Sequence, residues 1–309
     1  MSKTAFLFAG QGSQHAGMGR DLYEAYPVFR EVIDGVDLDF DLSSLMFEGP
    51  DEQLSQTRYT QPCMVAFAAG MTAILDEMGI KPDYVAGLSL GEYSALAAAG
   101  VFEPQQAIRL AAFRGNAMAR AAEGRTCAMV SILGLACEAV ESAVELAAAA
   151  GQGTVEVSNY NCPGQTVIAG DAPAVELAAA AAREAGARRC IPLHVSGPFH
   201  TSLLRPAGDA LRERFEEERF GEMHIPVLFN CLGHEMGAGD SIPALLERQV
   251  QSAVRMEDTI MRLVELGVDR VVEIGPGKVL SGLVRRCTKD IHCISVETCE
   301  DMESLKEEL

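Results

Sequence analysis

Apolar runs of strand length alternate with helical patterns in the first part of the chain. The run from Ala5 to Phe8 has the length and composition of a strand and ends in the glycine-rich turn Gly10-Gln11-Gly12-Ser13-Gln14. A second strand is predicted from Tyr84 to Ala86, followed by an alanine-rich helix from Leu90 to Ala99. A longer helix is predicted from Pro104, because proline suits the first helical turn and apolar residues then recur near the helical period.

The last part of the chain repeats this alternation. Buried strands are predicted from Val227 to Phe229 and from Val271 to Ile274. The second of them turns at Gly275-Pro276-Gly277 into a helix that begins near Val279. Strands that alternate with helices predict an α/β fold with a mostly parallel sheet covered on both faces.

The middle of the chain has a different pattern, in the order β-α-β-β-α-β. Its predicted strands and helices are Cys127 to Leu133, Cys137 to Ala149, Val155 to Ser158, Thr166 to Ala169, Ala174 to Glu184 and Cys190 to Val195. That order is typical of a ferredoxin-like unit. We therefore expect a core of residues 1–125 and 196–309, with an inserted ferredoxin-like α+β subdomain at 126–195 and a binding cleft between the two.

Composition and charge narrow the class of function. The 309 residues are 48% hydrophobic and 22% charged, which is ordinary for a soluble globular enzyme. A formal net charge of −19 argues against general binding to nucleic acid or to an anionic membrane, since both require a basic surface. No apolar run is long enough to span a membrane or to form a signal peptide, so we expect a cytoplasmic protein.

The nine cysteines are interpreted as reduced thiols. Their number is odd, and no Cys-x-x-Cys pair is present. A zinc motif that begins at His234-Glu235 fails because position 238 is alanine. No metal site is therefore expected, and no cofactor is expected either.

Gly87-Leu88-Ser89-Leu90-Gly91 carries the clearest chemical signal in the sequence. It is a Gly-x-Ser-x-Gly motif placed between a predicted strand and a predicted helix. A serine on such a tight turn is exposed, and the helix N-terminus behind it favours developing negative charge. The alternative is a serine that only caps a helix.

A serine nucleophile needs a base, and His200 is the candidate. It stands in the turn Gly197-Pro198-Phe199-His200, where the inserted unit is expected to rejoin the core. His194 alternates within a predicted strand and is interpreted as structural. The backbone N–H groups of Gln11 and Leu90 are candidates for an oxyanion hole. A dinucleotide loop is excluded at the Gln11 turn, because His15 occupies the position of the third glycine.

Arg114 lies among apolar residues on the helix predicted from Pro104, with Met118 one turn later on the same face. Two interpretations are open. The guanidinium extends to water from the edge of a solvated helix, or it binds a carboxylate through two parallel hydrogen bonds.

Six segments together resemble malonyl-CoA:acyl carrier protein transacylase, the malonyltransferase family of fatty acid synthesis. They cover the chain from residue 6 to about residue 283 in that family's order. The segments are Phe8 to Gln14, Gly87 to Tyr93, Arg114, Asn161 to Gln165, Ser196 to His200 and Glu273 to Lys278.

The resemblance implies a hydrolase-like core with a ferredoxin-like insert, and a role for each matching residue. Ser89 is acylated, His200 is its base, and the Gln11 and Leu90 backbone forms the oxyanion hole. Arg114 holds the malonyl carboxylate, and the family's histidine is oriented by a backbone carbonyl, which by position belongs to Gln249. Met118, Asn161 and Phe199 are expected at the substrate site.

Two positions depart from the family's pattern. Residues 253–256 read Ala-Val-Arg-Met, where the family usually has Pro-Val-x-Trp, and Leu88 replaces a histidine often found before the serine. The first departure lies four residues after Gln249, in the segment from which Gln249 is assigned.

The implied partners are malonyl-CoA and acyl carrier protein. Because carrier proteins are typically acidic, the basic stretch formed by Lys278, Arg285, Arg286 and Lys289 is a candidate docking surface, or else an ordinary solvated helix face. Three other functions stay open. They are a malonyl acyltransferase that serves a polyketide synthase, a serine thioesterase or esterase, and a binding module without activity. The hydrolase requires an acid that orients the histidine, usually between serine and histidine in chain order. Asp171 lies in that interval, but inside the predicted insert and away from the core.

Overall fold

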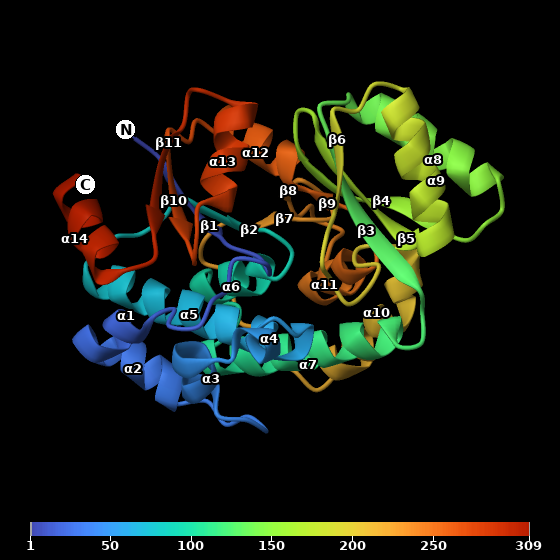
Figure 1. The fold of residues 1–309 in the computed structure, drawn as a ribbon. Coiled ribbons are helices and arrows are strands. Elements are labelled where there is room, and N and C mark those ends of the chain that lie inside the picture. The colour runs from blue at the N-terminus through green and yellow to red at the C-terminus, as the bar shows by residue number, and fades with distance from the viewer. Residues whose placement is uncertain (1, 309) are drawn as a thin grey trace. The chain divides into compact units, whose positions relative to one another are not determined.

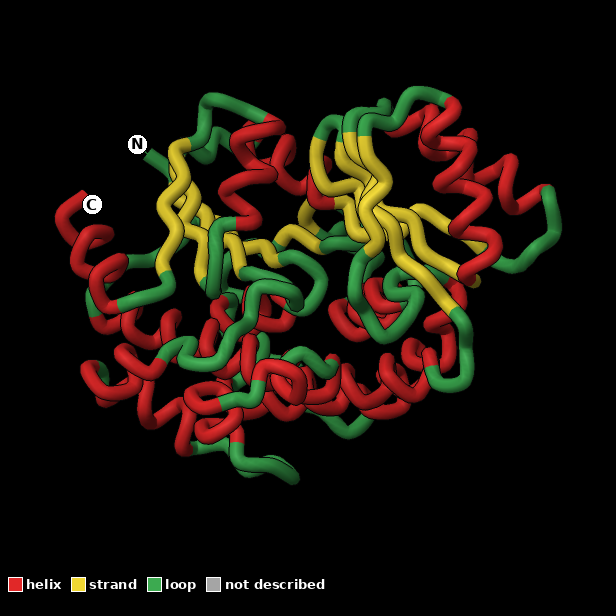
Figure 2. The backbone as a smooth tube through the Cα atoms, viewed as in Figure 1, coloured by secondary structure: helices red, strands yellow, loops and turns green. Residues whose placement is uncertain are grey.

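A computed structural model describes residues 2–308, and these form two compact units. Unit 1 comprises residues 2–116, 219–229 and 261–308. Unit 2 comprises residues 117–218 and 230–260. Figure 1 shows the elements of both units, and Figure 2 distinguishes their helices, strands and loops by colour.

Unit 1 contains a four-stranded parallel sheet in the order β11-β10-β1-β2 (Figure 1). The strands are β1 (Thr4–Phe8), β2 (Tyr84–Gly87), β10 (Arg270–Ile274) and β11 (His292–Val296). The sequence pattern predicted the first three of these strands and the parallel sheet, and both predictions are confirmed. Strand β11 was not predicted.

Strand β1 shows that both faces of this sheet are covered. Ala5, Phe6, Leu7 and Phe8 are each at most 1% exposed. Successive side chains of a strand point to opposite faces, so a run buried at every position requires packing on both sides. The strand lies between β10 and β2, with Phe6 level with Val272 and Val85.

Helices make up most of the rest of unit 1. They are α1 (Arg20–Ala25), α2 (Pro27–Asp34), α3 (Leu42–Glu48), α4 (Asp51–Leu54), α5 (Thr57–Glu77), α6 (Gly91–Ala98), α13 (Val279–Cys287) and α14 (Cys299–Glu308). Helix α6 packs against β1 and β2, and α5 packs against α6. Helix α7 (Pro104–Ala122) begins in unit 1 and ends in unit 2. Helix α12 (Met256–Glu265) begins in unit 2 and ends in unit 1.

The strand predicted at residues 227–229 and the helix predicted from residue 279 are both observed. Beside β2 lies β7 (Leu228–Phe229), where Val227 forms a parallel bridge with Val85. The predicted helix after the Gly275 turn is α13, and the buried Glu273 carboxylate accepts its first N–H groups, from Leu280 at 2.8 Å and Ser281 at 2.9 Å. A carboxylate at this end of a helix satisfies donors that have no partner within the helix.

Unit 2 is built on a five-stranded sheet in the order β6-β3-β5-β4-β9. Its strands are β3 (Cys127–Leu133), β4 (Val155–Cys162), β5 (Gln165–Asp171), β6 (Arg189–Pro192) and β9 (Val254–Arg255), and its first helices are α8 (Cys137–Ala149) and α9 (Ala172–Glu184). The first four strands in this order are antiparallel neighbours, and β9 is parallel to β4. The predicted order β-α-β-β-α-β is therefore observed.

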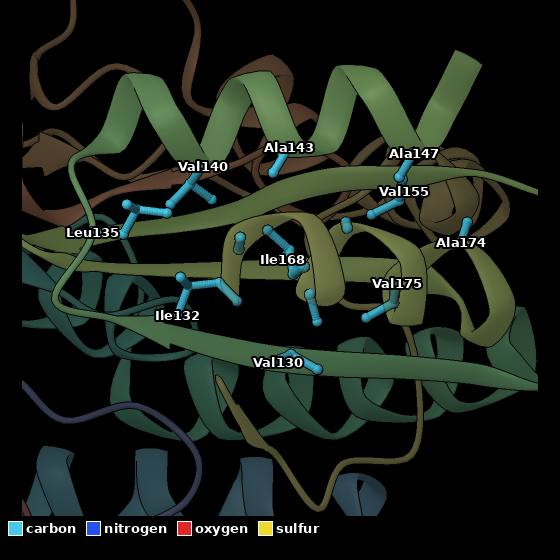
Figure 3. Packing of buried hydrophobic residues seen from close by; sticks show 13 residues of the cluster. Val130, Ile132, Leu135, Val140, Ala143, Ala147, Val155, Ile168, Ala174 and Val175 are labelled. Atoms are coloured by element: carbon cyan, nitrogen blue, oxygen red, sulfur yellow. The ribbon is translucent and has the colours of Figure 1, made fainter. Parts of the chain in front are cut away.

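Helices α8 and α9 pack on the sheet through small apolar side chains, as Figure 3 shows. Val140 of α8, Val175 of α9 and Ile168 of β5 are each 0% exposed in this cluster. Alanine at many of the helix positions lets the two helices approach the strands closely, which leaves the larger side chains of the strands to fill the space.

Unit 2 extends beyond residues 126–195, the range predicted for the inserted subdomain. It also contains a single 3-10 turn (Ser202–Leu204), α10 (Arg205–Phe215), β8 (His234–Glu235) and α11 (Ile242–Val250). Helices α10 and α11 pack against each other, and β9 adds a strand at the edge of the sheet. None of these contacts is visible in a local sequence pattern.

The last strand of the predicted β-α-β-β-α-β pattern is shorter than expected. Strand β6 ends at Pro192, whereas the pattern predicted a strand to Val195. The Leu193 N–H still donates to the Met129 carbonyl at 2.9 Å, but the Val195 N–H turns back to the Leu193 carbonyl at 3.1 Å. His194, predicted to lie within this strand, is therefore outside it and exposed.

Among residues 2–308, no helix is both long enough and apolar enough to cross a membrane.

Replacing Ile168 by alanine tests the packing of unit 2. Because Ile168 is fully buried beneath α8 and α9, the change should lower the free energy of unfolding by about 2–5 kcal/mol. Equilibrium urea unfolding measures it. Leu146→Ala on α8, where the side chain is 64% exposed, is the matched control and should change the value by less than about 0.5 kcal/mol. Equal losses in the two variants would contradict this account of the core.

Candidate active site

Ser89 lies on a tight turn between β2 and α6, as the sequence predicted. Its φ angle is 53°, in a region that residues other than glycine rarely adopt. The Leu88 N–H donates to the Phe8 carbonyl at 3.0 Å, and the Gly91 N–H donates to the Leu88 carbonyl at 3.0 Å. These bonds fix the turn against the end of β1 and hold the strained residue in place.

Two glycines allow this turn and the end of β1 to come close together. A Cβ atom at Gly91 would lie 2.2 Å from the Phe8 carbonyl oxygen, and one at Gly10 would lie 2.6 Å from the Leu88 carbonyl oxygen. No other residue fits at either position without a backbone shift. The Gly-x-Ser-x-Gly motif and the Gly10-Gln11-Gly12 turn are thus in direct contact.

Gln11 and Leu90, the expected oxyanion donors, belong to these two turns. The Gln11 side chain is anchored, because its Nε2 donates to Thr57 Oγ1 at 3.0 Å. Gln11 also lines a small cavity of about 140 Å³ together with Leu88, Val279 and Leu280.

Arg114 places a buried cation beside Ser89. Its Nη2 donates to Ser89 Oγ at 3.1 Å, and its Nη1 donates to Gln61 Oε1 at 2.8 Å. The side chain is only 1% exposed, so the interpretation of Arg114 as a solvated residue at a helix edge is wrong. Burial lowers the pKa of the guanidinium, and the neighbouring Tyr93 and Glu92 oppose that shift.

His200 has the second unusual backbone conformation. Within residues 2–308, Ser89 and His200 are the two non-glycine residues with positive φ, and the value for His200 is 60°. His200 Nδ1 donates to the Gln249 carbonyl at 2.9 Å within unit 2. The neutral ring then carries its lone pair on Nε2, the arrangement that a general base requires.

The segment that follows His200 is held from both sides. The Thr201 hydroxyl donates to the Pro198 carbonyl at 2.6 Å. The Ser202 N–H donates to one carboxylate oxygen of Glu156 on β4 at 2.9 Å, and the Ser202 hydroxyl donates to the other. These contacts restrain the strained turn that carries His200.

The remaining predicted substrate residues lie in unit 2 and are buried. Met118 is on α7, Asn161 on β4 and Phe199 in the turn before His200, with exposed fractions of 2%, 9% and 7%. Asn161 Oδ1 has no hydrogen-bond partner among the residues that the structure describes. Unit 1 thus brings Ser89 and Arg114 together, and unit 2 brings His200 and Gln249 together.

Sequence reasoning missed Gln61 and Thr57 as neighbours of the candidate site, and it named Tyr93 only as the last residue of a segment that resembles the family. Gln61 and Thr57 lie one turn apart on α5, outside every motif. Tyr93 lies on α6, with its ring centroid 5.6 Å from Arg114 Cζ. Nothing in the sequence links these residues to Arg114 or Gln11, because packing alone brings them together.

The hydrolase alternative requires an acid beside the histidine, and Asp171, which lies between Ser89 and His200 in the sequence, does not take that place. The Asp171 Oδ2 accepts the Thr154 N–H at 2.8 Å, and the Asp171 Oδ1 lies 3.9 Å from Arg125 Nη1. A backbone carbonyl contacts His200 Nδ1 instead. In the part of the chain that the structure describes, no group of three or more His, Cys, Asp or Glu residues is placed to hold a metal ion.

The parallel sheet and the Ser89 turn are typical of α/β proteins that present a serine nucleophile between a strand and a helix. The chain belongs to the acyl transferase domain family, whose model matches residues 5–306.

Curated relatives match over almost the whole chain. A malonyl CoA-acyl carrier protein transacylase from Bacillus subtilis is 43% identical, covering 100% of this chain and 99% of the relative. The protein of the same name from Escherichia coli is 40% identical, covering 93% of each chain.

Solved structures agree with these relatives. The structure of MCAT from Streptococcus pneumoniae has a TM-score of 0.94 at 45% identity and covers 99% of this chain and 100% of its own. A malonyl-transacylase in complex with a type II PKS acyl carrier protein has a TM-score of 0.95 at 38% identity, with 100% of both chains covered.

Proposed function

We propose that this chain is an S-malonyltransferase that moves the malonyl group from malonyl-CoA to the phosphopantetheine thiol of acyl carrier protein. The observation that carries the proposal is the buried Arg114 guanidinium, which donates to Ser89 Oγ at 3.1 Å. A fixed cation beside a nucleophile selects acyl groups that end in a carboxylate. The curated relatives, named malonyl CoA-acyl carrier protein transacylase, support the same substrate and acceptor.

The first half of the reaction loads the enzyme. Ser89 Oγ attacks the thioester carbon of malonyl-CoA, and its proton passes to His200 Nε2. The backbone N–H groups of Gln11 and Leu90 stabilise the oxyanion of the tetrahedral intermediate. The carbon–sulfur bond then breaks, and CoA leaves as a thiol with the proton from His200.

The second half of the reaction transfers the malonyl group from Ser89 to the carrier protein. The phosphopantetheine thiol of the carrier protein gives its proton to His200 and attacks the acyl-serine. When the intermediate collapses, Ser89 regains the proton and the malonyl group is bound to the carrier. Water competes at this stage, so a transferase must exclude or misplace water at the acyl-serine.

His200 acts as base and acid in turn, without a carboxylate behind it. The Gln249 carbonyl holds the Nδ1 proton in place, which keeps Nε2 available for Ser89. A carbonyl stabilises the imidazolium less than a carboxylate does, because it carries no net charge. This arrangement favours the transferase over the serine hydrolase alternative, in which an acidic residue fills that role.

Substrate contacts beyond Arg114 are assigned to Met118, Asn161 and Phe199. Met118 and Phe199 supply buried apolar surface. The buried side-chain oxygen of Asn161, Oδ1, is a hydrogen-bond acceptor for the pantetheine amides. No cofactor takes part in the proposed reaction, since all its steps are acyl and proton transfers.

We also propose the subdomain arrangement that the sequence predicts. Residues 126–195 form a ferredoxin-like subdomain inserted into a hydrolase-like core of residues 1–125 and 196–309. The sheet order β6-β3-β5-β4, with α8 and α9 packed on the cluster in Figure 3, supports that assignment. A cytoplasmic location is proposed as well, and nine free cysteines are in keeping with a reducing compartment.

A second candidate acceptor is the carrier protein of a polyketide synthase. The malonyl-transacylase solved with a type II PKS acyl carrier protein favours it, because its fold matches this chain with a TM-score of 0.95. The chemistry at Ser89 is the same for both acceptors, so carrier preference distinguishes them.

The carrier is proposed to dock on the basic end of α13. Arg285 and Arg286 are exposed in its last turn, with Lys278 before the helix and Lys289 after it. The Lys289 ammonium donates to the Arg285 carbonyl at 2.8 Å, which keeps this cation near the helix end. Such a surface complements an acidic carrier, although the chain as a whole is acidic.

Trapping the acyl-enzyme tests the proposed function. Wild-type protein incubated with labelled malonyl-CoA should retain label after quenching, Ser89→Ala should retain none, and added carrier protein should remove the label as malonyl carrier. Label released as free malonate whether or not carrier is present would identify a hydrolase instead. An absence of label on the wild type would refute malonyl-CoA as the substrate.

Arg114→Ala tests the selectivity. The loss of a charge-assisted contact worth about 1.5–3 kcal/mol should slow malonyl loading roughly 10- to 100-fold and raise acetyl loading relative to it. Rates of acylation by malonyl-CoA and acetyl-CoA give the ratio. Arg109→Ala, an exposed arginine on the same helix, is the control and should leave the ratio unchanged. An unchanged ratio in Arg114→Ala would remove Arg114 from the carboxylate site.

Charge reversal tests the docking surface. The double variant Arg285→Glu/Arg286→Glu should raise the KM for carrier protein about threefold or more, because it repels an acidic partner. Steady-state transfer measured against carrier concentration gives this value. Lys81→Glu, at an exposed lysine elsewhere in unit 1, controls for overall charge. If the double variant and the control have the wild-type KM, the carrier docks elsewhere.

A further inference from the structure

The Arg114 guanidinium contacts two buried side chains whose role the proposed reaction leaves unassigned. Tyr93 on α6 is 0% exposed, and Gln61 on α5 is 1% exposed. Arg114 itself is 1% exposed on α7. Three helices thus each contribute one buried polar or aromatic side chain to a single cluster beside Ser89.

Tyr93 presents its ring to the guanidinium. Arg114 Cζ lies 5.6 Å from the ring centroid, within the range of a cation–π interaction. Phe102 stacks on Tyr93 with centroids 6.3 Å apart and planes at 18°, which restrains the ring. The Tyr93 hydroxyl has no hydrogen-bond partner among the described residues, and burial raises its pKa, so it stays a neutral phenol. The ring is therefore the part of Tyr93 that acts on Arg114.

Gln61 holds the other side of the guanidinium. Its Oε1 accepts from Arg114 Nη1 at 2.8 Å, while Nη2 donates to Ser89 Oγ. Helices α5 and α7 come very close here, since a Cβ atom at Gly115 would lie 2.7 Å from the Thr57 carbonyl oxygen. Backbone packing thus fixes the distance across which Gln61 and Arg114 bond.

We propose that Tyr93 and Gln61 are positioning residues that set the acyl specificity of the enzyme by holding the Arg114 guanidinium in the plane that directs Nη2 toward Ser89. This inference rests on the proposed function, because it assigns the acyl carboxylate to Arg114. The planar guanidinium forms two parallel hydrogen bonds to a carboxylate only in one orientation. The ring face and the amide oxygen together define that orientation.

The two acyl groups depend differently on this orientation. A malonyl group gains a charge-assisted pair of hydrogen bonds only when the guanidinium is correctly turned. An acetyl group has no carboxylate, so its loading does not depend on the direction of the guanidinium. Loss of either positioning residue therefore changes the ratio of malonyl to acetyl loading, whereas damage to the general structure lowers both rates together.

Tyr93→Leu and Tyr93→Phe separate the ring from the hydroxyl. The ratio of malonyl to acetyl acylation rates should fall about 3- to 30-fold in Tyr93→Leu, the range expected for a buried cation–π contact. Tyr93→Phe retains the ring and should keep the ratio within about twofold of wild type. Single-turnover acylation by malonyl-CoA and acetyl-CoA, followed by intact-protein mass spectrometry, measures both rates.

Gln61→Glu is the second variant and is nearly isosteric, so it keeps the proposal testable if Tyr93→Leu does not fold. A carboxylate at position 61 pairs with Arg114 and repels the malonyl carboxylate. Malonyl loading should fall at least about tenfold, with acetyl loading little changed. Phe29→Leu, which removes a fully buried ring from α2 away from this cluster, controls for lost stability and should leave the ratio unchanged.

The outcomes distinguish this inference from the proposed function. A lowered ratio in Tyr93→Leu and Gln61→Glu, with recovery in Tyr93→Phe, supports the positioning role. If malonyl and acetyl loading fall equally in both variants, or if the ratio stays at the wild-type value, the positioning role is refuted. Arg114→Ala is assayed alongside, because an unchanged ratio in that variant would reject the Arg114 assignment itself.

Discussion

The contact between the end of β1 and the turn that carries Ser89 is the constraint on which the site in unit 1 depends. Gly91 and Gly10 bring backbone atoms so close that a single Cβ atom would lie 2.2 or 2.6 Å from a carbonyl oxygen. This contact fixes Ser89 at a positive φ and sets the Gln11 turn beside it. The strain at Ser89 persists because the parallel sheet on both sides of β1 cannot move to relieve it.

A buried charge lies beside Ser89, and the proposed acyl selectivity depends on it. Removing a guanidinium from water is costly, and Arg114 is 1% exposed, so its surroundings must stabilise it. The Gln61 amide, the Tyr93 ring and Ser89 Oγ all contribute. A ligand carboxylate adds the largest stabilisation available to such a cation, which is why we assign the acyl carboxylate to Arg114.

Local patterns predicted the secondary structure well wherever an element is set by its own residues. Strands β1, β2 and β10 and helices α8 and α9 follow from apolar runs and helical periodicity that the chain shows by itself. Strand β6 ends early, because hydrogen bonding beyond Pro192 depends on where β3 lies and on a local turn at Val195. Strand β9 has two residues and exists only because β4 lies beside it.

The sequence by itself singled out Ser89, His200 and Arg114 as candidates, because each stands in a segment whose glycines, proline or apolar neighbours define a local conformation. The family resemblance supplied the role expected of each. Only the tertiary structure decided how these groups are held. The bond from His200 to the Gln249 carbonyl was expected only from the family resemblance. The burial of Arg114, its bond to Gln61 and the Tyr93 ring against it come from packing between three helices. A local pattern carries no information about such pairs, because the packing of helices and sheets sets the distances between them.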